Sequence, residues 1–190
     1  MTDAECGFAY RTSIFNTTEK NRFVVLAVTY ALKKKGAPKI VYKDLQTFFG
    51  SGKPTLAETR QAVIKIRSDK SMVINSKDIN TKSAGSFFKN PLVSKEAYAE
   101  MCVSWGDKIP NYAVDDKMLK IPAAWLIEKS GFQKGYVKRN VGLSTKHTLA
   151  IINLGNASAN DVLALKEEIQ ARVKKQFGVD LKPEPIFVGM

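Results

Sequence analysis

The nine residues 83–91, which read S-A-G-S-F-F-K-N-P, hold the side chains best suited to chemistry in this chain. Ser86 follows a glycine and precedes two phenylalanines, and Lys89 and Asn90 come directly after the aromatic pair. A hydroxyl beside aromatic rings lies where water is scarce, and there it can deliver a proton to a reacting group. We therefore interpret Ser86 as a candidate proton donor with a cation and an amide beside it.

Two other charged residues each have an ordinary and a functional interpretation. Glu184 stands between Pro183 and Pro185, which stiffen the backbone and donate no hydrogen bond. This setting is typical of a carboxylate in an exposed turn. It would equally let Glu184 point into a site from the start of the last expected strand. Arg11, next to Tyr10, is typical of a surface charge or of a bidentate clamp on a carboxylate. The residues alone leave these alternatives open.

The stretch G-S-G-K-P at residues 50–54 imitates a phosphate-binding loop, and we interpret it as a turn. That motif needs a glycine where this chain has Thr47, and a serine or threonine where it has Pro54. No G-x-G-x-x-G occurs either, so the chain has no dinucleotide-binding fingerprint of its own.

Composition narrows the classes of partner. The 190 residues carry a net charge of +12, which favours anionic partners such as nucleic acid or a small molecule with a diphosphate. The basic residues do not form one arm, and no RNA-binding signature is present. One histidine and the widely spaced Cys6 and Cys102 predict no metal site and a reducing, cytoplasmic setting. The longest apolar run, residues 23–32, is far shorter than the ~20 residues that span a bilayer, and we expect neither a membrane span nor a signal peptide.

The hydrophobic pattern predicts an α+β fold. Helices are expected over residues 56–67, around 98–105, over 123–130, and between a Ser158 cap and Gly178. Strands are expected over residues 22–32, 148–153 and 185–188, because these runs are rich in β-branched or apolar residues. Helices and strands are mixed without a regular βαβ rhythm, so α+β is favoured over a doubly wound sheet.

Five blocks of sequence, taken together, carry a family resemblance. They are E-C-G-F-A-Y-R-T-S-I-F from Glu5, A-G-S-F-F-K-N-P from Ala84, A-W-L-I-E-K from Ala124, K-H-T-L-A-I-I-N from Lys146 and L-K-P-E-P from Leu181. In their order and spacing, the chain resembles the C-terminal half of the UDP-N-acetylenolpyruvoylglucosamine reductases, flavoenzymes of bacterial peptidoglycan precursor synthesis. The resemblance covers essentially all 190 residues.

The resemblance implies a reaction and a catalytic trio. Reduced flavin passes a hydride to the enolpyruvyl double bond of a UDP-sugar, and NADPH re-reduces the flavin. Ser86 matches the family's proton donor, while Arg11 and Glu184 match the other two catalytic positions. Arg11 would stabilise the developing negative charge, and Glu184 would orient and polarise through hydrogen bonds.

The resemblance also implies a substrate pocket and a cofactor contact. The positions that match substrate contacts are Tyr10, Tyr42, Lys70, Asn90, Tyr112, Lys134 and His147. Tyr42, Lys70 and Asn90 would hold the diphosphate, and Tyr112 and Lys134 the nucleotide end. Arg67, with Arg11, matches residues near the flavin ring of the cofactor FAD, where a cation favours the anionic reduced form.

By the same resemblance, residues 1–70 are the end of the flavin-binding domain, and residues 71–190 are the substrate-binding domain, with the last strand returning to the first domain. The family's N-terminal half, which holds most of the FAD surface, is expected to be missing. We therefore expect the isolated chain to be inactive and to bind little FAD. The expected protein is a monomeric, bacterial, cytoplasmic enzyme acting on UDP-N-acetylglucosamine enolpyruvate with NADPH, without nucleic acid or membrane as partners.

Two departures from the family pattern concern the pocket. Ala124 stands where the family usually has a glycine before Trp125, and K-R-N at residues 138–140 replaces small residues. The alternative hypothesis is a non-catalytic basic module that binds UDP-sugars or nucleic acid through its charge.

Overall fold

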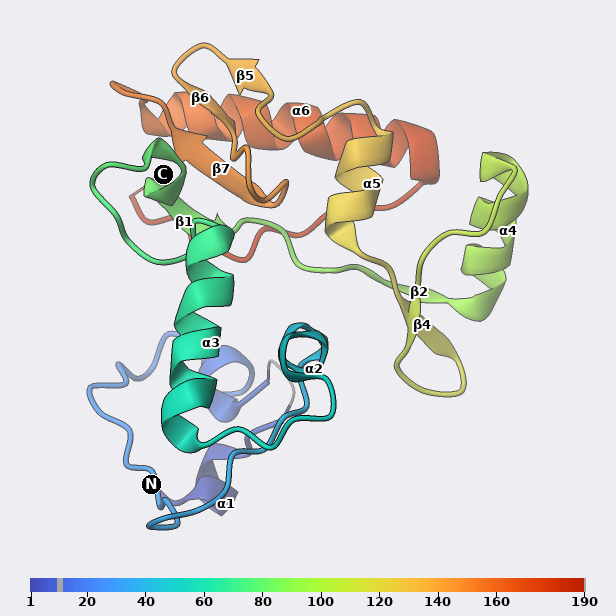
Figure 1. The fold of residues 1–190 in the computed structure, drawn as a ribbon. Coiled ribbons are helices and arrows are strands. Elements are labelled where there is room, and N and C mark those ends of the chain that lie inside the picture. The colour runs from blue at the N-terminus through green and yellow to red at the C-terminus, as the bar shows by residue number, and fades with distance from the viewer. Residues whose placement is uncertain (10–11, 190) are drawn as a thin grey trace. The chain divides into compact units, whose positions relative to one another are not determined.

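The computed structural model describes residues 1–9 and 12–189, so Tyr10, Arg11 and Met190 lie outside the described residues. The chain divides into two compact units, Met1–Ala37 and Pro38–Met190 (Figure 1). Among the residues described, none of the helices has the length and apolar character that crossing a membrane requires.

The first unit has little regular structure. It contains α1 (Asp3–Cys6), which begins with a capping box between Thr2 and Glu5, and the short 3-10 helix η1 (Ile14–Asn16). The ring of Phe15 packs against those of Phe8 and Phe23, with centroids 6.5 and 6.2 Å away.

The strand predicted over residues 22–32 is wrong. Residues 23–33 have no regular secondary structure, and the side chains of Val24 and Leu26 are 83% and 91% exposed. A β-rich composition favours an extended backbone, but a strand forms only where a neighbour takes its hydrogen bonds. In the described part of this unit no other strand is available to pair with it.

The second unit begins with two helices that pack together. They are α2 (Lys43–Phe49), which the sequence pattern did not predict, and α3 (Leu56–Asp69). The helix predicted over residues 56–67 is thus confirmed, with its capping box between Thr55 and Glu58. Between the two helices, residues 50 and 51 form the expected turn.

A four-stranded antiparallel sheet has the order β1-β7-β6-β5. Its strands are β1 (Ser83–Ser86), β5 (Val137–Lys138), β6 (Val141–Leu143) and β7 (Ala150–Asn153). The strand predicted over residues 148–153 is confirmed as β7. It begins later than predicted because a turn, closed by the Ala150 N–H bonding the His147 carbonyl at 3.0 Å, precedes it.

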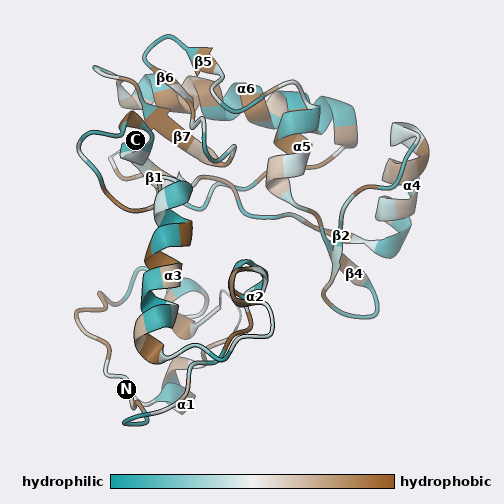
Figure 2. Cartoon of the chain, viewed as in Figure 1, coloured by the Kyte–Doolittle hydropathy of each residue, from teal (hydrophilic) through white to brown (hydrophobic). Residues whose placement is uncertain are grey.

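The longest helix, α6 (Ala159–Phe177), packs against β6 and against α5 (Ala123–Lys129) (Figure 1). It has the predicted Ser158 cap and ends at Gly178 in the left-handed conformation. Leu165, Ile169 and Val173 form its fully buried stripe, and each such side chain contributes roughly 1.5–3 kcal/mol on burial. Figure 2 shows the same hydrophobic character along β7.

A second, three-stranded sheet has the order β2-β4-β3 and contacts α4 (Lys95–Trp105), which confirms the helix predicted around residues 98–105. Its strands are β2 (Leu92–Ser94), β3 (Tyr112–Ala113) and β4 (Met118–Lys120). Trp105 of α4 packs on Trp125 of α5 and Phe177 of α6, with ring centroids 5.4 and 5.2 Å away. Mixed helices and antiparallel sheets confirm the α+β class.

The last strand, predicted over residues 185–188, is also wrong. Only Pro183 makes an isolated bridge, to Phe88, and the residues that follow have no strand structure. Ile186 and Val188 are each 87% exposed. As with residues 22–32, the part of the chain that the structure describes offers no partner strand there.

Candidate functional site

Ser86 lies at the end of β1, opposite Ala150 of β7. The backbone continues this pairing, because the Phe87 N–H donates to the Leu149 carbonyl at 2.8 Å. The Phe87 carbonyl accepts a 2.8 Å hydrogen bond from the Glu184 N–H. The backbone around Phe87 therefore brings together the strand end with Ser86, the turn before β7 and the segment with Glu184.

The conformation of β1 depends on its neighbours in the S-A-G-S-F-F run. Gly85 has φ +78°, and nothing lies within 4 Å of where a Cβ would be, so backbone conformation and not space requires glycine there. The register against β7 shifts between Ser83 and Ser86, as at a β-bulge, which re-aims the side chain that follows. Phe87 and Phe88 are buried at 4% and 2% exposure and pack edge to face. Ser86, directly before them in the sequence, is half-buried.

His147 lies in the turn that precedes β7 and is half-buried. Its Nδ1 accepts a 3.1 Å hydrogen bond from the Leu149 N–H, which assigns the proton of the neutral ring to Nε2. Burial lowers the pKa of His147, and the nearby Lys70 and Lys134 lower it further, while Glu128 opposes them. The imidazole is therefore neutral near pH 7 and presents an N–H donor beside two cations.

The end of α3 contributes Lys70, which is the C-cap residue of the helix. Its Nζ forms a 2.5 Å ion pair with Asp44 of α2, in which both side chains are about half exposed. Tyr42 is the N-cap residue of the same helix α2, and Arg67 lies in the last turn of α3. Tyr42, Arg67 and Lys70 thus come from neighbouring helix ends, and all three are exposed.

Asn90 has a structural partner that the sequence did not reveal. Its Oδ1 accepts a 2.9 Å hydrogen bond from the N–H of Ala123, the first residue of α5. Pro122, at the N-cap position of that helix, provides no side-chain cap. Asn90 therefore supplies from a distant part of the chain the cap that α5 lacks locally.

Tyr112 is not placed on the sheet that carries Ser86. It belongs to β3 of the second sheet, with its ring 57% exposed and the Nζ of Lys120 5.7 Å from the ring centre. The structure brings Ser86, Glu184 and the turn with His147 together and puts Tyr112 on a different sheet. Tyr10 and Arg11 lie outside the described residues, so their predicted roles stay predictions.

Comparison with known proteins places this arrangement in a family. Residues 77–188, more than half of the chain, match the sequence profile described as UDP-N-acetylenolpyruvoylglucosamine reductase, C-terminal domain. The chain belongs to the UDP-N-acetylenolpyruvoylglucosamine reductase family. Ser86, His147 and Glu184 all lie within the matched residues of this reductase family.

Curated relatives named UDP-N-acetylenolpyruvoylglucosamine reductase align with 96–100% of the chain. The protein of Thermobifida fusca is 42% identical over 100% of this chain and 56% of its own length. That of Mycolicibacterium gilvum is 39% identical over 96% of this chain and 53% of its own length. That of Corynebacterium diphtheriae is 41% identical over 98% and 50%. The chain thus spans about half the length of these reductases.

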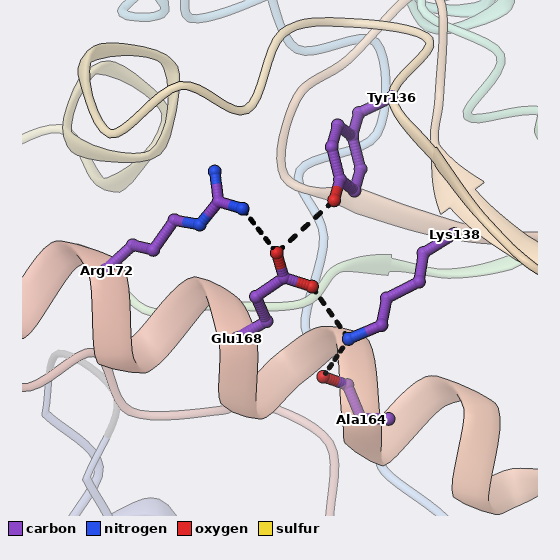
Figure 3. Close-up of polar contacts among 5 residues, drawn as sticks. All are labelled: Tyr136, Lys138, Ala164, Glu168 and Arg172. Atoms are coloured by element: carbon purple, nitrogen blue, oxygen red, sulfur yellow. Dashed lines mark hydrogen bonds and ion pairs between the residues drawn. The ribbon is translucent and has the colours of Figure 1, made fainter.

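Lys138, one of the departures from the reductase pattern, is engaged in an ionic cluster on α6 (Figure 3). Its Nζ donates to Glu168 Oε2 at 2.7 Å and to the Ala164 carbonyl at 3.3 Å. Arg172 and Tyr136 donate to the other oxygen of Glu168 at 2.6 and 3.3 Å. The hydrogen bond from Lys138 is the main cause of the lowered pKa of Glu168. Lys138 therefore ties β5 to α6.

Sequence reasoning missed the polar residues that hold the turn with His147. Asn80, in the 3-10 helix η2 (Ile79–Thr81), is buried and bonds to Ser144 and Thr145. Thr148 is buried, and its hydroxyl donates a short hydrogen bond to Glu128 of α5. Single amide or hydroxyl side chains leave no periodic signal in a sequence. No local pattern indicates these contacts, because their partners lie 20 to 65 residues away along the chain.

Proposed function

We propose that this chain supplies the substrate pocket and the proton donor of a flavin-dependent reductase. The reaction is the NADPH-dependent reduction of UDP-N-acetylglucosamine enolpyruvate to UDP-N-acetylmuramate in peptidoglycan precursor synthesis. The observation that carries the proposal is the convergence of Ser86, Glu184 and the turn with His147 around the backbone of Phe87. These three lie within the residues matched to the reductase domain.

The acidic and hydroxyl groups serve the enolpyruvyl end in this proposal. Ser86 is half-buried and holds a proton on Oγ, which it gives to the substrate carbon next to the one that receives hydride. A neutral hydroxyl suffices because that carbon is strongly basic. Glu184, whose N–H bonds to the Phe87 carbonyl, orients the reacting group through hydrogen bonds of its carboxyl group. Arg11 would stabilise the charge that develops on the carboxylate.

The cations and the imidazole serve the diphosphate and nucleotide end. Lys70 and Lys134 are close enough to His147 to lower its pKa, and together they favour an anion. The Nε2–H of neutral His147 is a donor for a phosphate or hydroxyl oxygen. Lys70 would exchange Asp44 for the diphosphate, which Tyr42 and Asn90 also contact. Tyr112 would reach the nucleotide end from the second sheet.

Flavin chemistry fits the residues that the chain contributes. Arg67 is an exposed cation at the end of α3, and such a group suits the anionic form of a reduced flavin ring. When bound, the flavin supplies the hydride, and NADPH returns the flavin to its reduced form. We propose that residues 1–70 belong to the flavin-binding domain and residues 71–190 to the substrate domain, and that most of the FAD surface comes from the half of the relatives that this chain does not span.

The test replaces Ser86 by alanine in the complete, flavin-bearing protein. Turnover of the UDP-sugar should fall by about 10²–10⁴-fold, the usual contribution of a positioned proton donor. The reduction of flavin by NADPH, followed in a stopped-flow instrument, should remain within about twofold, because it needs no proton from Ser86. Ser83→Ala, on the same strand, is the matched control and should change neither step. A parallel loss of both half-reactions in S86A would show that Ser86 is not the proton donor.

The net charge of +12 favours a second candidate, a basic module that binds polyanions without catalysis. Binding through phosphate charge falls steeply with salt and ignores the sugar. A substrate pocket instead prefers the UDP-sugar over both UDP and RNA at every salt concentration. Titrating the chain with these three ligands at two salt concentrations decides between the candidates.

A further inference from the structure

The loop of residues 144–149 joins β6 to β7 and carries His147. The buried side chain of Asn80 holds the start of this loop. Asn80 is 8% exposed, and its Oδ1 accepts three hydrogen bonds from the start of the loop. The donors are the Ser144 hydroxyl at 3.1 Å, the Thr145 N–H at 2.9 Å and the Thr145 hydroxyl at 3.2 Å. The partners are 64 or 65 residues apart in sequence, so this contact belongs to the tertiary fold.

Asp78 aligns Asn80 and connects it to the end of α3. Its Oδ1 accepts from both the backbone N–H and the side-chain Nδ2 of Asn80, each at 2.9 Å. Its Oδ2 accepts a 2.6 Å hydrogen bond from Ser71, which is buried and follows Lys70 directly. The hydrogen bonds from Ser71 and Asn80 lower the pKa of Asp78, so the acceptor is ionised. The pair Asp78–Asn80 thus links the helix end with Lys70 to the loop with His147.

A second anchor holds the loop from the side of α5. The buried Thr148 donates to the carboxylate of Glu128, and the turn closes with the Leu149 N–H on Nδ1 of His147. His147 is therefore fixed between an anchor before it and an anchor after it. The charged groups that face it come from three places: Lys70 from the end of α3, Lys134 from the turn after α5, and Glu128 from α5 itself.

We propose that Asn80 is a positioning residue that sets the loop of residues 144–149 so that His147 faces a ligand together with Lys70 and Lys134. Both ends of its amide are engaged, with Oδ1 on the loop and Nδ2 on Asp78. Its part is therefore to place other groups and not to touch the ligand. Its loss would leave the Thr145 N–H and two hydroxyls without this acceptor, and a buried donor without a partner is costly.

His147 itself reports on this placement, because it is the single histidine of the chain. Its ring protons therefore give one unambiguous titration by NMR. In the 190-residue chain, Asn80→Ala should move the pKa of His147 upward toward the ordinary value of about 6.5, because the freed imidazole is better hydrated and farther from Lys70. Asn160→Ala, an exposed asparagine in the first turn of α6, makes the same chemical change and should leave the titration unchanged.

Binding of UDP, followed by the same signals, gives a second readout. N80A should weaken UDP binding by about tenfold. This is the change in affinity that corresponds to losing one or two of the hydrogen bonds that position the loop. This arm rests on the function proposed above, whereas the pKa arm does not. If the wild-type chain fails to bind UDP while N80A still shifts the titration, the proposed function is wrong and the positioning role stands. A folded N80A chain with the wild-type pKa would overturn the positioning role.

The wild-type chain provides a measurement that does not depend on how N80A folds. The amide proton of Thr145 should exchange with solvent as slowly as the paired amides of β7, because its hydrogen bond to Asn80 must open before exchange can occur. Exchange at the rate of an exposed loop would overturn the proposal whatever the variant does.

Discussion

The N–H of Glu184 donates a 2.8 Å hydrogen bond to the carbonyl of Phe87, the residue that follows Ser86. The Lys89 N–H bonds in the same way to the Lys182 carbonyl at 2.9 Å. The segments that carry the two candidate catalytic residues, Ser86 and Glu184, are thus joined by backbone hydrogen bonds on either side of Phe88. The geometry between them depends on how firmly residues 87–89 are held.

Phe87→Ala should destabilise the chain by about 3–5 kcal/mol, the usual effect of removing a buried aromatic ring. Phe87 is 4% exposed and packs edge to face on Phe88, so its loss leaves a cavity under both hydrogen-bonded segments. The free energy of unfolding in urea measures the effect. Phe48→Ala, at a ring that is 48% exposed, is the control and should cost much less. Equal losses at the two positions would contradict the buried placement of Phe87.

His147 should make stability depend on pH around neutrality. Its pKa in the folded chain is lowered, mainly by burial, so the unfolded chain takes up the proton first as the pH falls. The stabilisation is present above the unfolded value of about 6.5 and is lost as the pH drops through it toward the folded value. The difference in unfolding free energy between pH 7.5 and pH 5.5 should therefore be smaller in His147→Gln. An identical difference in wild type and H147Q would show that the ring titrates normally.

Asn90 allows its structural and proposed functional parts to be separated. Asn90→Ala should cost about 1 kcal/mol of stability, because the Ala123 N–H at the start of α5 loses its acceptor. Asn90→Asp keeps an acceptor and places a negative charge at a helix N-terminus, so it should retain most of that stability. Both variants remove the amide donor proposed for the diphosphate. If N90D binds UDP as well as wild type does, Asn90 is only a cap.

The Lys138–Glu168 pair should contribute to stability and not to ligand binding. Its side chains are 32% and 22% exposed, so solvent screens the interaction, and Lys138→Met should cost only about 0.5–1 kcal/mol. A double-mutant cycle with Glu168→Gln at low and high salt measures the coupling. An unchanged stability together with weaker UDP binding would place Lys138 in the pocket instead.

The helices α3 and α6 could be predicted because their signals are local. Thr55 and Glu58, or Ser158 and Asp161, lie three positions apart, and each pair forms the capping box that the sequence suggests. The strands expected over residues 22–32 and 185–188 do not form, because strand formation depends on a neighbour and composition reports only the preference for an extended backbone. Val24 and Ile186 are exposed for that reason.

The candidate site could be predicted in part. The S-A-G-S-F-F run indicated Ser86 as a candidate site residue, and the structure adds that Ser86 ends a strand that Glu184 and the turn with His147 meet. The partner of Asn90, the N–H of Ala123 33 residues away, and the loop anchor at Asn80 could not be predicted from spacing. Each depends on a single long-range hydrogen bond or a few of them, and no local pattern encodes such contacts.

A cluster of three aromatic residues lies where α4, α5 and α6 meet, and its fluorescence reports on one unit only. It consists of Trp105, Trp125 and Phe177. The chain has two tryptophans, and both are in this cluster. Tryptophan emission should therefore follow the unfolding of Pro38–Met190 and should not respond to the unfolding of Met1–Ala37. A melting curve recorded by fluorescence and one recorded by a signal from the N-terminal residues would coincide only if the two units unfold as one.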